Sequence, residues 1–74
     1  MTLKELKINK MAKIKNIKEK EETIKRRMLD LGIISGSIIK PVLKSPLGSL
    51  RAYEIRGSLI AIRTEEAEKI EIDV

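Results

Sequence analysis

The sequence predicts a mainly β domain, a small five-stranded barrel with one α-helix between the first and second strands. Its 74 residues suffice for one domain, residues 1–74, with a thin core. Apolar and polar residues alternate over several short segments, which is the period of half-buried strands. Helical spacing occurs convincingly in one longer segment, residues 21–31. Short strands joined by tight turns favour a sheet that closes on itself and so removes its exposed edges.

The first strand is predicted over residues 11–17, where Ala12 and Ile14 point one way and the lysines the other. Four more strands are predicted over residues 37–44, 52–56, 59–63 and 70–74. Pro41 favours an edge position or a bulge in the second strand, because proline cannot donate to a ladder.

Turns and caps are predicted from residue type. Gly57 and Ser58 are expected to form a two-residue hairpin loop. Thr2 and Glu5 have the spacing of a capping box at the start of a short turn. Residues 65–68 are expected to form one helical turn.

Ile24, Met28 and Leu31 recur at helical spacing and predict one buried stripe on the helix. Leu29 lies off this stripe; we expect it to pack in the core, with an apolar contact to a partner as the alternative. The glycines are expected to fill turn positions or positions of positive φ rather than to bind ligands. These structural glycines are Gly32, Gly36, Gly48 and Gly57.

The chain contains neither cysteine nor histidine. This composition excludes disulfides, zinc fingers, haem and iron–sulfur sites, and catalysis by Ser-His or Cys-His pairs. No apolar run is long enough to span a membrane, and the first residues do not form a secretory signal, so we expect a cytoplasmic protein. The net charge is +5, and the positive charge is concentrated in residues 1–27. This basic segment predicts a solvated surface or, alternatively, contact with an acidic partner, a nucleic-acid backbone or anionic lipid headgroups.

Three motifs in order carry a resemblance to a known family. Arg27 to Gly36 reads Arg-Met-Leu-Asp-Leu-Gly-Ile-Ile-Ser-Gly, followed by Pro-Leu-Gly and by a hairpin from Tyr53 to Arg63. This order resembles the ferrous iron transport protein A (FeoA) family, with its Arg-Leu-x-x-Leu-Gly-x-x-x-Gly, Pro-Leu-Gly and Tyr-x-x-x-Gly-x-x-x-Ala-Leu-Arg elements. Met28 and Ile62 replace leucines of the family pattern, and Ser-Leu stands where Asp-Pro is usual. The resemblance covers residues 2–74.

The resemblance implies an SH3-like barrel. It also implies an accessory role beside the large membrane ferrous iron permease with a GTPase domain (FeoB-type), at the inner face of the membrane through that partner. Similar SH3-like domains occur at the end of metal-dependent repressors, which is an alternative reading of the fold. A weak homo-oligomer stays open.

Candidate partner contacts are Arg27, Leu29, Arg56 and Arg63, since arginine forms bidentate pairs with carboxylates. For Arg27, the competing interpretation is that its guanidinium binds carbonyl groups at the helix end or a nearby glutamate of the same chain. The family is often associated with transition metals, and the only clustered donors here are Glu65, Glu66 and Glu68. Iron prefers imidazole with carboxylate, so we expect a solvated turn, no metal site and no cofactor.

Three other functions compete with a protein-interaction module. A small basic barrel could bind nucleic acid, but base stacking usually needs several aromatic side chains and Tyr53 is alone. A proline-peptide groove needs the same aromatic lining. An enzyme is the weakest interpretation, because carboxylates alone would have to act in a barrel with little concave volume.

Overall fold

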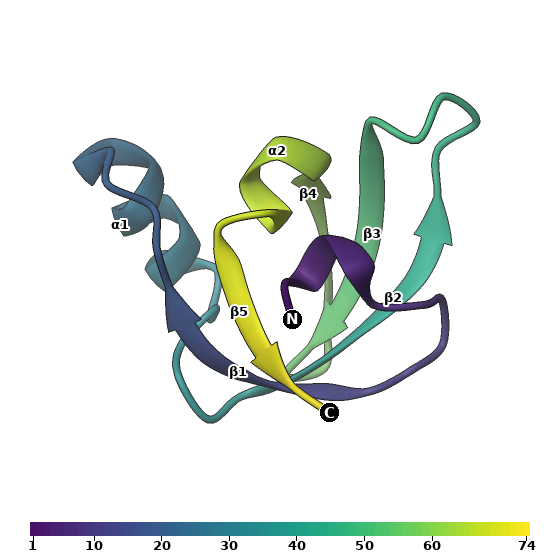
Figure 1. Cartoon of the computed structure of the whole chain (residues 1–74), viewed down its shortest axis with the longest axis horizontal. Helices are drawn as coiled ribbons and strands as arrows, with labels where there is room; N and C mark the ends of the chain where they lie inside the picture. Colours follow the sequence, from purple (N-terminus) through teal and green to yellow (C-terminus); the bar gives the residue numbers. More distant parts are fainter.

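The computed structural model describes all 74 residues and contains one five-stranded antiparallel sheet, as predicted (Figure 1). The strands lie in the order β4-β3-β2-β1-β5, and α1 lies between β1 and β2 in the chain. The elements are η1 (Leu3–Glu5), β1 (Ala12–Ile17), α1 (Glu22–Asp30), β2 (Ile38–Lys44), β3 (Leu50–Ile55), β4 (Ser58–Arg63), α2 (Thr64–Ala67) and β5 (Ile70–Asp73). None of the helices has the length and apolar character needed to cross a bilayer.

The core is aliphatic apart from one tyrosine, and every strand contributes to it. Ala12 and Ile14 are buried on β1, so the predicted alternation is confirmed there. On β3 the same period buries Tyr53 and Ile55. The core residues are Leu3, Leu6, Ala12, Ile14, Met28, Ile33, Ile39, Tyr53, Ile55, Ile62, Ala67, Ile70 and Ile72.

The C-terminal end of α1 differs from the predicted apolar stripe. Met28 is buried, but Leu31 is 38% exposed and Leu29 is 46% exposed, so the prediction of core packing is wrong for both. The helix ends at Asp30, and Gly32 adopts a φ of +91°, which redirects the chain. Ile33 therefore enters the core instead, and its N–H closes the helix end on the Met28 carbonyl at 3.0 Å.

Two irregularities set the register of the sheet. The β2–β3 register shifts between Pro41 and Leu43, which confirms the predicted bulge. The β3–β4 loop consists of Arg56 and Gly57, one residue earlier than predicted, because Ile55 pairs with Ser58. Both loop residues have positive φ, 51° and 81°, which is the conformation of a type I′ turn.

One outer edge of the sheet is covered by the chain itself, and the other is not. The N-terminal segment covers β5: Thr2 bridges Glu71, and the Ile72 N–H donates to the Met1 carbonyl at 2.9 Å. The other outer strand, β4, pairs with β3 alone. The barrel is therefore not closed by a ladder between β4 and β5, and one edge stays open, contrary to the expectation that closure removes the edges.

A conservative change at Tyr53 tests the packing of the core. Its side chain is fully buried and its hydroxyl has no hydrogen-bond partner. Burial raises the pKa of the Tyr53 phenol, and the nearby Arg51 guanidinium opposes the shift. Since removal of an unsatisfied hydroxyl relieves a desolvation penalty, we expect Tyr53→Phe to leave the free energy of unfolding unchanged or to raise it by about 1 kcal/mol. Urea unfolding followed by far-ultraviolet circular dichroism measures this. A loss of more than about 1 kcal/mol would mean that the hydroxyl is satisfied in solution.

Candidate partner-binding surface

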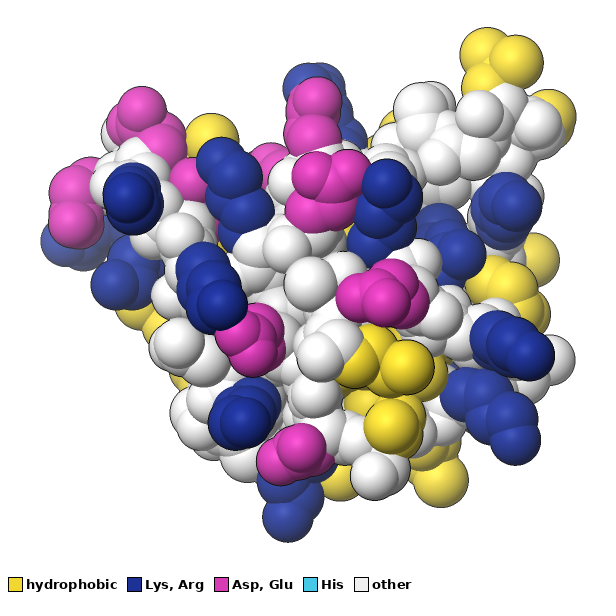
Figure 2. Space-filling model, viewed as in Figure 1, with side chains coloured by type: hydrophobic (Ala, Val, Ile, Leu, Met, Phe, Trp, Pro, Cys, Tyr) yellow, Lys and Arg dark blue, Asp and Glu magenta, His cyan; other side chains and the backbone are white.

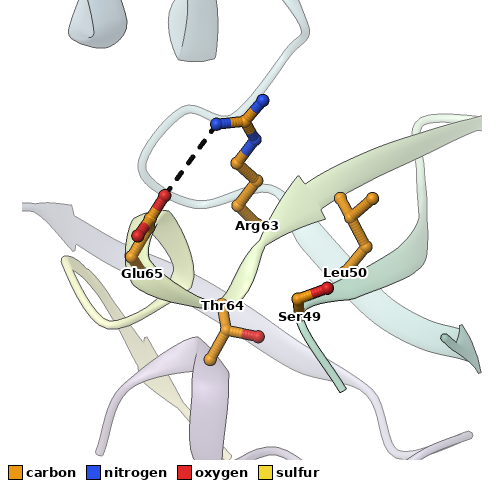
Figure 3. A pocket seen from close by; sticks show the side chains of 5 residues that line it. All are labelled: Ser49, Leu50, Arg63, Thr64 and Glu65. Carbon is orange, nitrogen blue, oxygen red and sulfur yellow. Dashed lines mark ion pairs between the residues drawn. The ribbon is translucent and has the colours of Figure 1, made fainter. Parts of the chain in front are cut away.

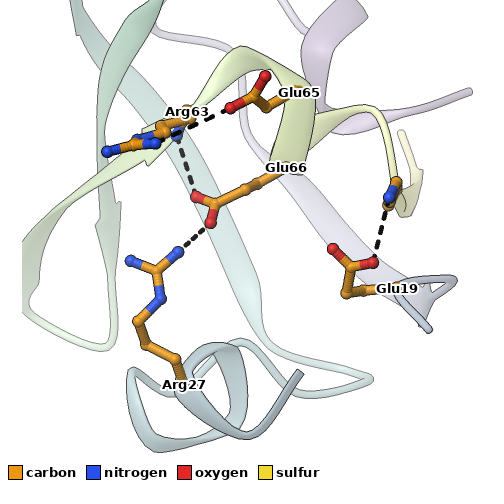
Figure 4. A network of polar contacts seen from close by, with 6 residues as sticks. Glu19, Arg27, Arg63, Glu65 and Glu66 are labelled. Carbon is orange, nitrogen blue, oxygen red and sulfur yellow. Dashed lines mark hydrogen bonds and ion pairs between the residues drawn. The ribbon is translucent and has the colours of Figure 1, made fainter. Parts of the chain in front are cut away.

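Two of the predicted partner-binding arginines meet at Glu66 (Figure 4). The Glu66 carboxylate projects from α2 and is only 11% exposed. It accepts a hydrogen bond from the Arg27 guanidinium of α1 through Oε2, and one from the main-chain N–H of Arg63 through Oε1 at 3.3 Å. Glu66 therefore ties α1 to the junction of β4 and α2. Arg27 is therefore paired with a carboxylate of the same chain in the structure.

The Arg63 side chain points away from this contact and lines a cavity of about 410 Å³ (Figure 3). The other lining residues are Ser49, Leu50, Thr64 and Glu65. Glu65 lies 3.9 Å from the Arg63 guanidinium, and the Thr64 hydroxyl donates to the Gly48 carbonyl at 2.6 Å. The latter bond fixes the start of α2 to the β2–β3 loop. With a 69% exposed side chain, Arg63 remains accessible to a partner carboxylate.

Arg56 and Leu29 lie in different surroundings. The stem of Arg56 packs against Gly32, since a Cβ at that glycine would lie 3.3 Å from Arg56 Cδ. Arg56 thus lies beside the end of α1. Leu29 lines a separate hollow of about 190 Å³ with residues of β1 and of the segment after α1, among them Ile17 and Ile34. The structure therefore brings Arg27 and Arg63 together and leaves Leu29 outside that group.

The three glutamates weighed as metal donors turn toward three different cations. Glu66 binds Arg27, Glu65 faces Arg63, and Glu68 accepts from Lys4 Nζ at 2.9 Å. No three side chains of His, Cys, Asp or Glu converge in a way that could hold a metal ion. The arrangement is that of ion pairs at the surface and not of a coordination sphere.

Glu19 is a structural carboxylate that the sequence did not reveal, because it lies within a Lys/Glu run typical of a solvated face. Its side chain is 5% exposed. It accepts from the main-chain N–H of Lys20 at 2.9 Å and from Lys69 Nζ at 3.1 Å. These contacts fix the segment before α1 to the segment before β5.

The charges on the surface are unevenly distributed. Figure 2 shows acidic side chains over α1, α2 and the β1–β5 side, whereas the side over β2 and β3 carries mainly basic and apolar ones. Strand β2 contributes Lys40 and Lys44 without an acid, and β3 contributes Arg51 with Glu54. Among these, Glu54 lies 3.8 Å from Lys40. This side of the sheet is therefore predominantly positive.

The model of the FeoA domain family matches residues 1–74 of the chain. The chain belongs to the FeoA family. A Campylobacter jejuni relative that bears the name Fe(2+) transport protein A is 32% identical over 74 residues, which are 100% of this chain and 99% of that one. The predicted resemblance is confirmed.

Solved FeoA structures share the fold. The FeoA protein of Chlorobium tepidum has a TM-score of 0.92 at 31% identity, covering 100% of this chain and 70% of that chain. FeoA of Stenotrophomonas maltophilia, solved in complex with zinc and described as a procaryotic SH3 domain protein, has a TM-score of 0.85 at 28% identity. That match covers 99% of this chain and 89% of the other. The SH3-like barrel implied by the resemblance is likewise confirmed.

Removal of the Glu66 carboxylate tests its structural role. Because Glu66→Ala deletes two hydrogen bonds from a nearly buried carboxylate, we expect the free energy of unfolding to fall by about 1.5–3 kcal/mol. The matched control is Glu65→Ala on the same turn, which removes only an exposed ion pair and should change stability by less than about 1 kcal/mol. Chemical denaturation of both variants is the measurement. Equal effects of the two substitutions would contradict the role given to Glu66.

The acid sensitivity of the fold tests the Glu19 contacts. Its hydrogen bond from Lys69 and those from the Glu21 and Lys20 N–H groups lower the pKa of Glu19 below 4.5, against the opposing effect of desolvation. A lowered folded-state pKa contributes stability that is complete above the ordinary value and is lost as pH falls through the lower one.

We therefore expect Glu19→Gln to be less stable than the parent at pH 6. We also expect it to lose less stability than the parent between pH 5 and pH 3, because the Glu19 carboxyl titrates at about 4.5 in the unfolded chain and at a lower pH in the folded chain. The pKa values of Glu5 and Glu71 are also lowered, the first chiefly by the Thr2 N–H and the second by Lys18, so some acid dependence remains. Denaturation at several pH values gives both slopes. A variant with the parent's slope would contradict the assignment.

Proposed function

We propose that this FeoA protein is an accessory protein of ferrous iron uptake that docks on the GTPase part of a membrane ferrous iron permease of the FeoB type and modulates it. The observation that carries the proposal is membership of the family over the whole chain, residues 1–74, with a relative named for Fe(2+) transport that matches from end to end. In this role the protein acts from the cytoplasm and reaches the membrane through its partner.

The side chains of the candidate surface suit protein contact better than catalysis. The chain has no histidine or cysteine, and the carboxylates beside the arginines are engaged in ion pairs. Arg27 and Arg63 keep 52% and 69% of their side chains exposed, so their remaining N–H groups can bind carboxylates of a partner. We therefore propose a non-enzymatic role.

The donor set does not fit a resident transition metal. Zinc is bound in the Stenotrophomonas relative, but this chain offers neither imidazole nor thiolate and no converging carboxylates. In the proposed role, iron is therefore the cargo of the partner permease and is not bound by this chain.

A nucleic-acid-binding role is less well supported. The one aromatic residue, Tyr53, is fully buried in the core, so no aromatic side chain is available on the surface to stack on a base. Basic groups alone would give only salt-sensitive, non-specific binding.

Capture of the permease tests the proposal. The detergent-solubilised permease is passed over the immobilised chain with and without guanine nucleotide, and we expect the parent chain to retain it. Charge reversal in Arg63→Glu should weaken retention by about tenfold if the exposed guanidinium meets a partner carboxylate. Lys10→Glu, at an exposed lysine that makes no ion pair, is the matched control with the same change in net charge.

Two results would count against the proposal. One is that the parent chain does not retain the permease under either nucleotide condition. The other is unchanged ferrous iron uptake in cells that lack this chain. Equal losses for Arg63→Glu and Lys10→Glu would instead show that retention depends only on net charge.

A further inference from the structure

We propose that the outer edge of β4 binds an extended acidic segment of a partner protein, which adds to the sheet as a sixth strand. The identity of the protein that supplies this segment rests on the proposed function; the binding edge itself does not. Three observations carry it: the direction of the main-chain groups of β4, the side chains beside them, and the charges around the edge.

The β3–β4 turn determines which main-chain groups of β4 are free. Since Ile55 and Ser58 close a two-residue hairpin, hydrogen-bonded pairs recur at every second position toward the strand ends. The N–H and C=O groups of Leu59 and Ala61 therefore point away from β3. None of the main-chain hydrogen bonds outside the regular ladders involves either residue. Two donors and two acceptors thus face outward at the spacing of a strand.

The open stretch has a defined end and no protection. At Arg63 the Glu66 carboxylate accepts the main-chain N–H and so closes the edge. Between Ser58 and Ile62 the residues are Ser-Leu-Ile-Ala-Ile, without the proline, lysine or bulge that usually protects an edge strand. Leu59 is 63% exposed at this place. The edge can therefore accept a short strand of about five residues.

The outward face of the sheet continues the apolar character of the edge. Ala61 lies opposite Ala52, which in turn lies opposite Leu43. Leu43 is 63% exposed, and the short side chains of the two alanines leave a shallow depression beside it. Every second side chain of an added strand would lie next to Leu59 or Ala61 on this face, where an apolar residue would bury surface.

The charges around β4 select an acidic occupant. Arg56 precedes the strand, and Arg63, 3.9 Å from Glu65, ends it. Arg51 lies on the adjacent strand β3, and Lys40 and Lys44 lie one strand further away, on β2. Glu54 is the one acidic residue of β2, β3 and β4, and it is paired with Lys40. A second copy of the chain, itself of net charge +5, would bring the same positive field to the contact. In a segment that alternates acidic and apolar residues, the apolar side chains would pack on the outward face of the sheet, and the acidic ones would meet the basic side chains around the edge.

A peptide titration tests the edge directly. The probe is the synthetic peptide acetyl-Glu-Val-Glu-Val-Glu-Val-amide, added to the isotopically labelled chain and followed by amide resonances. We expect the largest shifts at Leu59 and Ala61, together with slower hydrogen exchange of these two amides, because they would become donors to the peptide. The same peptide with lysine in place of glutamate should bind at least tenfold more weakly. Shifts confined to other places, or unchanged exchange at both amides, would overturn the proposal.

Two substitutions at one position separate the main-chain contact from the fold. Ala61→Pro removes an N–H that the β3 ladder does not use, so the sheet can tolerate it, and we expect peptide binding to fall at least tenfold. Should that variant not fold, Ala61→Glu keeps the N–H but places a negative charge on the face beside the acidic peptide, and binding should again fall. Met11→Glu, at an apolar residue that is 66% exposed and precedes β1, three strands from β4, is the control and should bind like the parent. Parent-like binding by folded Ala61→Pro, or by Ala61→Glu in its place, would overturn the proposal.

The permease capture then distinguishes this inference from the proposed function. Retention that is lost in Ala61→Pro but kept in Met11→Glu would support both. Retention kept in folded Ala61→Pro would overturn the edge as the docking site and leave the proposed function standing. Failure of the parent to retain the permease, with peptide binding intact, would overturn the proposed function alone. Self-association that Ala61→Pro abolishes, seen by sedimentation, would overturn the acidic occupant in favour of a second copy.

Discussion

The tight turn at Arg56 and Gly57 is the constraint on which much of the molecule depends. Because both residues have positive φ, the turn pairs Ile55 with Ser58 and so determines the register of β4. A slip of one residue would move Ile62 out of the core and Ala61 into it, since side chains alternate between faces. The same register directs the free main-chain groups of β4 outward. One short turn therefore governs both a wall of the core and the open edge of the sheet.

Charged side chains in this protein hold the architecture together as well as covering it. A chain of 74 residues has a thin core, so its helices need further attachment to the sheet. Glu66 connects α1 to α2 through Arg27. Glu19 connects the segment before α1 to the segment before β5 through Lys69. Each carboxylate is nearly buried and accepts at least two hydrogen bonds, which is the condition under which such a group stabilises a fold.

The distribution of these pairs shapes what the surface can do. Acidic side chains are concentrated near α1 and α2, where they neutralise arginines and lysines of the same chain. On β2, β3 and β4, Lys40 and Arg63 lie near Glu54 and Glu65, whereas Lys44 and Arg51 have no carboxylate partner. The outward face of these strands is partly apolar and exposed. A surface of this kind suits the proposed contact with another protein through shape and charge. It needs no reactive group, which agrees with the absence of histidine and cysteine from the sequence.

The sequence by itself determined the five strands, the helix, the bulge near Pro41 and the family, because these follow from local periodicity, turn residues and motif order. It also marked Arg27 and Arg63 as candidates for contact with carboxylates. Only the tertiary structure decided that the two share Glu66, since 36 to 39 residues separate Arg27 from the others in the chain. Likewise, the exposure of Leu31 and the open edge of β4 depend on where a helix ends and on which strands meet. Those are properties of packing between distant segments, which local patterns do not encode.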